Sequence, residues 1–355
     1  MAIAQALNPD ALRPALSDDP RRIPAQSRRA EQVRSTKNCD VPMWLVARHD
    51  DIRPAFGDLT RDVLLRDPPK HGRLRRAVSR EFTPRRIEAL RPKVEQVTER
   101  LLAEVAPRGQ AELIEDFAVP LAITIVMELL GVPRVDQENF RYWADLVTGM
   151  RGGDENEVPQ AYAEASGYLA DLIRHKAKTT GDVANTDLLS ALVRADDSDR
   201  LPERELTSLA FLLLVAGYLT TIDLIGNGMS ALLRNPDQLE LLRTKPELIG
   251  AALEEFLRSV EPTSHATLQF AEEGLKIGGV EIPAGDPVVL APAAAGRGQL
   301  AFGRDIHHCI GAPLALRESE VAFSALLGRC QDLALSTTAE LTWQSGLPVT
   351  FRPIT

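Results

Sequence analysis

One segment of the chain, residues 300–315 with the sequence LAFGRDIHHCIGAPLA, surrounds a cysteine with groups that could support chemistry. Cys309 follows two histidines, lies between glycines and precedes Pro313, a residue that favours the first turn of a helix. A helix beginning at about Ala312 would point its free N–H groups and its positive dipole end at the sulfur. We therefore expect this loop to hold Cys309 as a thiolate, the form that binds metals and acts as a nucleophile.

Three uses of Cys309 remain open from this loop alone. A zinc site needs three or four ligands at recognisable spacing, and only His307 and His308 are near, because Cys39 and Cys330 stand apart in the sequence. A cysteine protease needs a histidine base and a group that orients it, and no local nucleophile signature surrounds this cysteine. The third use is structural, as a small buried side chain.

The segment AGYLTT, in the middle of an apolar stretch, could form a groove for a small ligand. Ala216 and Gly217 make a helix thin at this point, and the hydroxyl of Thr220 can bond back to an earlier carbonyl. Small residues are also common where helices pack closely. A packing contact is therefore the alternative interpretation of this segment.

Two pairs of polar residues have helical spacing. Glu255 and Arg258 are three residues apart in EEFLR, so that carboxylate and guanidinium can meet on one helix face. His71 and Arg75 are four apart in DPPKHGRLRR and together could bind two carboxylates of a cofactor. Taken singly, the first pair is typical of a surface ion pair and the second of a solvated basic helix face.

Helical periodicity dominates the segments that must position these residues. The clearest helix spans about residues 203–233 and is apolar on nearly every face, which predicts that it crosses the interior. Strands are expected at MWLVARH, in a hairpin LKIGGVEIPAG that turns at Gly278 and Gly279, at PVVLAP and at LPVTFRP. Further helices are expected at about residues 87–105, 121–130, 138–148, 160–178, 236–243, 246–260 and 313–330.

The composition is that of a folded protein. The 355 residues are 44% hydrophobic and 26% charged, and no linker or repeat divides them, so we expect one domain over residues 1–355. The net charge of −9 makes nucleic acid an unsuitable partner. Three cysteines without framework spacing argue against structural disulfides. We find no signal-peptide core and no stretch that approaches the roughly 18 apolar residues of a membrane span, and we expect a cytoplasmic protein with no membrane partner.

The four motifs, taken in their order along the chain, resemble one family. His-x3-Arg, Ala-Gly-x-x-Thr-Thr, Glu-x-x-Arg and Phe-Gly-x-x-x-His-x-Cys-x-Gly together resemble the cytochrome P450 family, in particular the soluble bacterial haem-thiolate monooxygenases. The resemblance extends from VPMWLVARHDDIR to the last expected strand. It implies a mainly α fold with small β-sheets and a long central helix over a haem b cofactor.

The resemblance implies a role for each matched residue. Cys309 would bind haem iron through its thiolate, and Phe302 would pack on the sulfur side of the haem. Thr220 would hold bound dioxygen and help to route protons, while Glu255 and Arg258 would form a buried structural ion pair near the haem. The remaining implied cofactor-binding residues are His71, Arg75 and His307 for the propionates, with Ala216, Gly217 and Gly311 beside the haem. The implied substrate pocket contains Leu213, Thr263, Thr267 and Leu347.

The chain departs from the family pattern at several positions. Leu219 stands where the family has an acid before the distal threonine, and the resemblance leaves two alternatives for this position. Protons arrive through water or a substrate hydroxyl, or the protein performs coupling or peroxide-driven chemistry. Asp305 replaces a glycine of the cysteine loop, and Gln269 replaces a propionate-binding arginine. The chain is also short between Phe56 and Asp67, and only GRGQ separates VVLAPAAA from LAFGRD.

The resemblance implies a monooxygenase that oxidises an apolar small molecule, in most members by hydroxylation, with dioxygen and electrons from a ferredoxin and a ferredoxin reductase. The segment LIGNGMSALLRNPDQLELLR is similar to members that tailor polyketides and macrolides in antibiotic biosynthesis. The alternative is a haem-free or inactive relative that activates another biosynthetic enzyme, such as a glycosyltransferase. Leu219, Gln269 and the short segments favour this alternative, and the retained cysteine loop argues against it.

Overall fold

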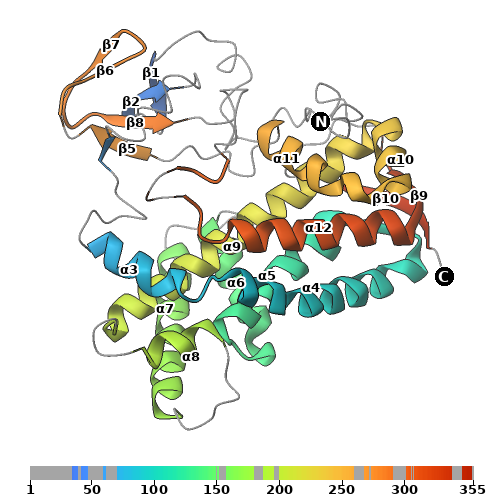
Figure 1. The fold of residues 1–355 in the computed structure, drawn as a ribbon, viewed down its shortest axis with the longest axis horizontal. Helices are drawn as coiled ribbons and strands as arrows, with labels where there is room; N and C mark the ends of the chain where they lie inside the picture. Colours follow the sequence, from blue (N-terminus) through green and yellow to red (C-terminus); the bar gives the residue numbers. More distant parts are fainter. Residues whose placement is uncertain are drawn as a thin grey trace.

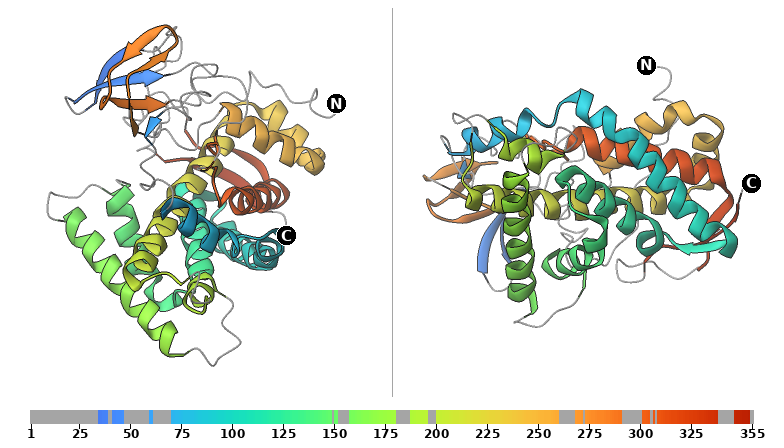
Figure 2. Two further views of the ribbon diagram at one scale, coloured as in Figure 1. Left: turned by 60° about the vertical axis from the view of Figure 1, so that its left-hand side comes forward. Right: turned by 90° about the horizontal axis from the view of Figure 1, so that it is seen from below.

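The computed structural model has a body of helices with small sheets at its edges, as expected (Figure 1). The largest sheet lies at one end of the molecule in each view (Figures 1 and 2). The structure describes residues 34–38, 41–46, 59–60, 70–148, 150–151, 157–179, 187–195, 200–259, 268–271, 273–290, 301–304, 306, 308–337 and 346–353.

Each expected helix is present within a few residues of its expected limits. The segment expected at 246–260 begins with a 3-10 turn, η4 (Pro246–Leu248), before α11. The basic cluster, for which the sequence suggests a helix face, forms α3. The helix α8 was not foreseen, because it is too short to show a periodic pattern. The α-helices of the described residues are α3 (Lys70–Ser79), α4 (Pro84–Val105), α5 (Val119–Leu130), α6 (Gln137–Thr148), α7 (Glu157–Lys178), α8 (Leu188–Val193), α9 (Glu203–Leu233), α10 (Pro236–Thr244), α11 (Ile249–Ser259) and α12 (Ala312–Arg329).

Prolines and a capping threonine define several helix starts. Pro84, Pro236 and Pro313 occupy the first turns of α4, α10 and α12, where the absence of an N–H leaves no bond unmade. Thr83 accepts a hydrogen bond from the Arg86 N–H at 3.3 Å and so caps α4. These local signals explain why the helix limits could be read from the sequence.

The strands form three sheets among the described residues. The hairpin of β6 (Leu275–Ile277) and β7 (Val280–Ile282) turns at Gly278 and Gly279, as expected, with φ of 55° and 84°. The five-stranded sheet has the order β1 (Arg34–Asn38), β2 (Val41–Val46), β8 (Pro287–Leu290), β5 (Leu268–Ala271) and β3 (Leu59–Thr60). The three-stranded sheet has the order β4 (Gln110–Glu112), β10 (Pro348–Pro353) and β9 (Cys330–Leu335).

The central helix α9 passes through the helical body (Figure 1). Residues 221–233 are all buried, whereas the preceding turns leave part of their surface open. Gly228 lets α9 approach two neighbouring helices closely, because a Cβ there would lie 2.6 Å from Phe323 of α12 and 2.8 Å from Phe256 of α11. The core therefore packs around the second half of α9.

The helices α4 and α12 lie side by side (Figures 1 and 2). Arg317 pairs with Glu88 at 2.9 Å, and Arg329 pairs with Glu99 at 2.6 Å. The two pairs connect corresponding ends of the helices, which therefore run in the same direction. This packing fixes the start of α12, where the cysteine loop ends.

The central helix also corrects one expectation from the sequence. By length and composition, α9 is apolar enough to cross a membrane, with a mean hydropathy of 2.0 in its most apolar window, of which 50% is buried. We had expected no segment to approach this limit, and that expectation was wrong because polar residues such as Asp223 interrupt the apolar run without lowering its mean much. The core helix of a folded protein meets the same criterion.

Candidate functional site

The cysteine loop folds back on itself before α12. The N–H of Cys309 donates to the carbonyl oxygen of Phe302 at 2.7 Å. Gly303 adopts a φ of 70°, the left-handed conformation that glycine reaches without a steric penalty. These two features turn the chain so that the side chain of Cys309 is exposed just before the start of α12. Asp305 and His307 lie outside the described residues.

Opposing effects act on the sulfur of Cys309. Although Cys309 keeps solvent-exposed surface, the protein atoms around its sulfur desolvate the thiol and raise its pKa, while hydrogen bonds from the N–H groups of Gly311 and Ala312 and the charge of Arg75 lower it. Burial is the largest effect, and the pKa lies above its ordinary value. The expected N–H donors and a neighbouring cation are therefore present beside the sulfur, and burial opposes their effect on its pKa.

Gly311 has a smaller steric role than its spacing suggests. A Cβ at this position would lie 3.8 Å from the Cys309 sulfur, an ordinary van der Waals distance. Its backbone is right-handed, with φ of −80°. Within the described part of this loop, Gly303 is the glycine that the backbone conformation favours.

The structure brings α3 to the cysteine loop. Arg75 lies close enough to Cys309 for their charges to interact, and burial lowers the pKa of the Arg75 guanidinium. His71 is half-buried one turn earlier on the same helix. Arg73 forms an ion pair with Glu205 of α9 at 2.5 Å, which ties α3 to the central helix. That tie was not foreseen, because its two residues are far apart in the sequence.

The residues of AGYLTT point in different directions. The hydroxyl of Thr220 donates to the carbonyl of Ala216 at 2.8 Å, the expected back-bond, and this hydrogen bond is exposed. Gly217 faces α5, because a Cβ there would lie 2.6 Å from Cγ2 of Val126. Gly217 thus serves a packing contact, while Ala216 and Thr220 share an open face of α9. Leu213, one turn before Ala216, is half-buried.

Other expected site residues have distinct surroundings. Glu255 and Arg258 form the ion pair, with the Arg258 Nε 2.8 Å from the Glu255 carboxylate, and their side chains are 13% and 26% exposed. Phe302 is half-buried against the hydrophobic core, with its ring centroid 6.5 Å from that of His308. Thr263 and Thr267 lie outside the described residues.

Leu347 lies in the hydrophobic core, whereas the sequence analysis places it in the substrate pocket. Its side chain is 3% exposed and belongs to the hydrophobic core. Its carbonyl accepts from the N–H of Leu113, which fixes it beside β4 and β10. Sequence alone could not separate a pocket leucine from a core leucine, because both are apolar positions next to a strand.

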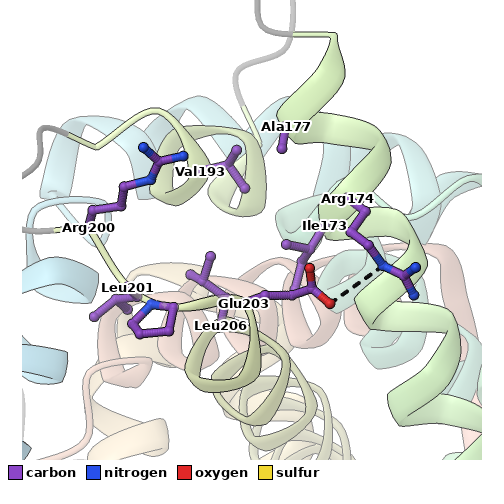
Figure 3. A pocket seen from close by; sticks show the side chains of 9 residues that line it. Ile173, Arg174, Ala177, Val193, Arg200, Leu201, Glu203 and Leu206 are labelled. Carbon is purple, nitrogen blue, oxygen red and sulfur yellow. Dashed lines mark ion pairs between the residues drawn. The ribbon is translucent and has the colours of Figure 1, made fainter.

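A separate cavity of about 370 Å³ lies between α7, α8 and the start of α9 (Figure 3). Apolar side chains such as Ile173 and Leu206 line it, and Arg174 pairs with Glu203 at 3.5 Å on one side. None of the residues that the sequence analysis assigned to the site lines this cavity. The cavity is therefore distinct from the cysteine site.

The donor set around Cys309 suits a cofactor bound through one thiolate. Within the described ranges, no three His, Cys, Asp or Glu side chains gather where they could hold a metal ion, so those residues form no zinc site. The exposed sulfur, the neighbouring cation of Arg75 and the open face at Ala216 and Thr220 fit a haem with a propionate and a distal helix.

Comparisons with known proteins agree with this arrangement. No family model matches the chain. It is 42% identical over 357 aligned positions to the cytochrome P450 monooxygenase PikC of Streptomyces venezuelae, covering 88% of this chain and 84% of the relative. It is 41% identical to the 6-deoxyerythronolide B hydroxylase of Saccharopolyspora erythraea, covering 79% and 74%. A structure of a variant of the P450 MycG in complex with mycinamicin IV is 32% identical and superposes with a TM-score of 0.83, covering 94% of this chain and 98% of that one.

Sequence identity of this extent along most of both chains, the shared helical fold and the cysteine loop before α12 lead to one conclusion. The chain belongs to the cytochrome P450 family and is a P450 monooxygenase.

Proposed function

We propose that this protein binds haem b through Cys309 and oxidises an apolar small molecule of the polyketide or macrolide class. The observation that carries the proposal is the exposed Cys309 sulfur at the start of α12, which two peptide N–H groups and the charge of Arg75 surround. Electrons would come from a ferredoxin and its reductase. The reaction would take place in the cytoplasm.

The proposed haem contacts come from three segments. Cys309 would bind the haem iron through its thiolate, and Phe302 would pack against the haem. Because burial raises the pKa of the Cys309 thiol, iron binding must displace its proton. Arg75 and His71 on α3, with His307, would bind the propionates, and Gly311 would lie beside the ring. When bound, the haem supplies the redox chemistry that activates dioxygen.

The open face of α9 would form the other side of the site. The hydroxyl of Thr220 donates to the Ala216 carbonyl, and its oxygen can accept a hydrogen bond from a water molecule or a hydroxyl group in the pocket. Leu219 supplies no carboxyl group beside it, so the proton must reach Thr220 through water or a substrate hydroxyl. Leu213 and Ala216, with Thr263 and Thr267, would contact the substrate. Glu255 and Arg258 would support the haem-side core through their ion pair, without taking part in the reaction.

The substrate class rests on the relatives. One is named as a hydroxylase of 6-deoxyerythronolide B, and another as a hydroxylase and epoxidase of mycinamicin IV. Leu213 and Leu219 give the exposed part of α9 an apolar character that suits such substrates. We therefore propose a role in natural-product tailoring.

The reduced carbon monoxide difference spectrum tests this function. Haem-loaded protein should show the Soret band of a thiolate-ligated haem, and Cys309→Ala should lose that band while its far-ultraviolet circular dichroism remains helical. Cys330→Ala is the matched control, because Cys330 is buried at the start of β9 and away from the loop. A wild-type protein that takes up no haem would refute the proposal and support the haem-free partner instead.

A further inference from the structure

Tyr218 is the residue of the AGYLTT segment to which the proposed reaction assigns no role. Its side chain is fully buried, and its hydroxyl donates to Oδ1 of Asp145 on α6 at 2.5 Å. Asp145 is itself only 8% exposed. A hydrogen bond between a phenol and a buried carboxylate is short and strong, because little water competes for either group.

Asp145 extends this contact to a third element. Arg141, one turn earlier on α6, has its Nε 3.6 Å from Oδ2 of Asp145. Arg141 also pairs with Glu115 of the π-helical turn η2 (Ile114–Ala118). Tyr218 of α9 is thus the buried end of a chain of polar contacts that holds α6 between η2 and the central helix.

A second contact lies on the same face of α9. Phe211 is seven residues before Tyr218, which is two helical turns, and its ring meets the ring of Tyr162 on α7 edge to face at 4.6 Å. The helices α6 and α7 are joined by the rings of Phe140, Trp143 and Tyr168. The pair α6–α7 therefore contacts α9 along one face.

The open face of α9 lies in the same turn as Tyr218. Successive helical residues are rotated by about 100°, so Gly217, Tyr218 and Thr220 face different neighbours. Gly217 contacts α5, and Tyr218 contacts α6, while Ala216 and Thr220 remain on the open side. Two fixed contacts on adjacent residues determine how far α9 can rotate about its axis at this turn.

We propose that Tyr218 is a positioning residue: its hydrogen bond to Asp145 sets the rotation of α9 that places Ala216 and the Thr220 hydroxyl in the reaction site. This inference rests on the proposed function for its consequence, but the contact itself can be tested without that function. Leu219 increases the importance of this rotation, because the residue that precedes Thr220 carries no carboxyl group and the orientation of the helix must place the hydroxyl.

Hydrogen exchange tests the contact in the haem-loaded protein. Tyr218→Phe should raise the exchange rate of the backbone N–H groups of residues 216–224 about fivefold, the factor that corresponds to a hydrogen bond of about 1 kcal/mol. Tyr168→Phe is the matched control, because it removes a phenol that donates to Asp136 at the same 2.5 Å but does not contact α9 through that bond. Unchanged exchange in Tyr218→Phe would overturn the proposal.

The carbon monoxide complex tests the consequence at the site. The C–O stretching band reports polarity and hydrogen bonding on the distal side of a haem. Tyr218→Phe should shift or broaden this band, and Tyr168→Phe should leave it as in the wild type. An equal change in both variants would indicate general loosening and would overturn a positioning role.

Asp145 variants complete the test. Asp145→Leu should raise the exchange of residues 216–224 at least as much as Tyr218→Phe, and adding Tyr218→Phe to it should cause no further increase, because the Tyr218–Asp145 hydrogen bond is already lost. Asp145→Asn keeps an acceptor oxygen and should restore part of the protection. If the two substitutions raised the exchange rates of residues 216–224 additively, the proposal would be contradicted. If the wild type bound no haem, the proposed function would fail, while the exchange measurements on the haem-free protein would still decide whether the contact holds α9.

Discussion

At the residue scale, desolvation by the surrounding protein atoms is the largest influence on the pKa values of Cys309 and Glu318. In Cys309, burial outweighs two N–H donors and a nearby arginine, so the thiol pKa is raised. Glu318 of α12 is the stronger case, because its side chain is 3% exposed and its Oε2 has no hydrogen-bond partner among the described residues. Burial raises the pKa of Glu318 well above its ordinary value of 4.5.

Glu318→Gln should make the protein more stable at pH 8 than the wild type, by about 1–3 kcal/mol. The folded protein holds the Glu318 proton more tightly than the unfolded chain. Its stabilising effect is therefore full below pH 4.5 and is lost as the pH rises through the raised folded-state pKa. Glutamine does not ionise, so the variant escapes this loss. Urea unfolding at pH 4.5 and pH 8 measures the difference.

Glu320→Gln is the control for this prediction. Glu320 lies on the same helix, but its side chain is 43% exposed and pairs with Arg317. Its substitution should change the unfolding free energy by less than about 1 kcal/mol at either pH. If the unfolding free energies of the Glu318 and Glu320 variants changed with pH in the same way, burial of Glu318 would not explain its effect on stability.

At the element scale, α9 combines packing and function on different faces of one helix. Gly217 allows contact with Val126 of α5, and Tyr218 bonds to α6. The remaining side of this turn, with Ala216 and Thr220, stays open. The same short segment therefore fulfils both interpretations that its sequence allows, with the packing role on Gly217 and the groove on its neighbours.

Gly217→Ala should destabilise the protein by about 1–3 kcal/mol, because its new methyl group would overlap Val126. Gly167→Ala is the matched control: this glycine is exposed on α7, and nothing lies within 4 Å of an added Cβ. The substitution Gly167→Ala should stabilise the protein by about 0.5–1 kcal/mol, because alanine favours the helix more than glycine does. Chemical unfolding of both variants, and of Gly217→Ala with Val126→Ala, measures these effects. Failure of Val126→Ala to recover any of the loss would argue against the overlap.

At the scale of the whole molecule, the proposed site is assembled from segments far apart in the sequence. Arg75 lies on α3, the Thr220 face on α9 and Cys309 before α12. Arg73 and Glu205 connect the first two, and α4 packs beside α12. A cofactor that contacts all three segments should bind the folded chain only, and thereby stabilise it.

Addition of haem to the haem-free protein should raise its unfolding free energy by about 2.7 kcal/mol at a free haem concentration near a hundred times the dissociation constant. Arg75→Gln should weaken haem binding by about 1.5–3 kcal/mol, through loss of a charge-assisted hydrogen bond, and should therefore remove at least about half of this gain at the same haem concentration. Arg100→Gln is the control, because Arg100 pairs with Glu104 on the surface of α4. Thermal unfolding with and without haem provides the measurement. If haem raised the unfolding free energy of the Arg75 and Arg100 variants equally, Arg75 would not be a haem-binding residue.

Local signals in the sequence account for much of the fold and predict which residues form the site. Proline at helix starts, long apolar periodicity and the Gly278–Gly279 turn are each encoded within a few residues, and the structure has these elements. The spacing of Glu255 and Arg258 predicts their ion pair for the same reason. The short helix α8 and the strands β3 and β4 carry too few residues for a pattern.

The sequence by itself determined the family, the helical elements and the residues of the cysteine loop, because these depend on residue type and local spacing. Only the tertiary structure decided that the Cys309 thiol is protonated more readily than usual, that Leu347 belongs to the core, and that Tyr218 bonds to Asp145. Burial and contacts between distant segments control these properties, and neither is a feature of any short stretch of sequence.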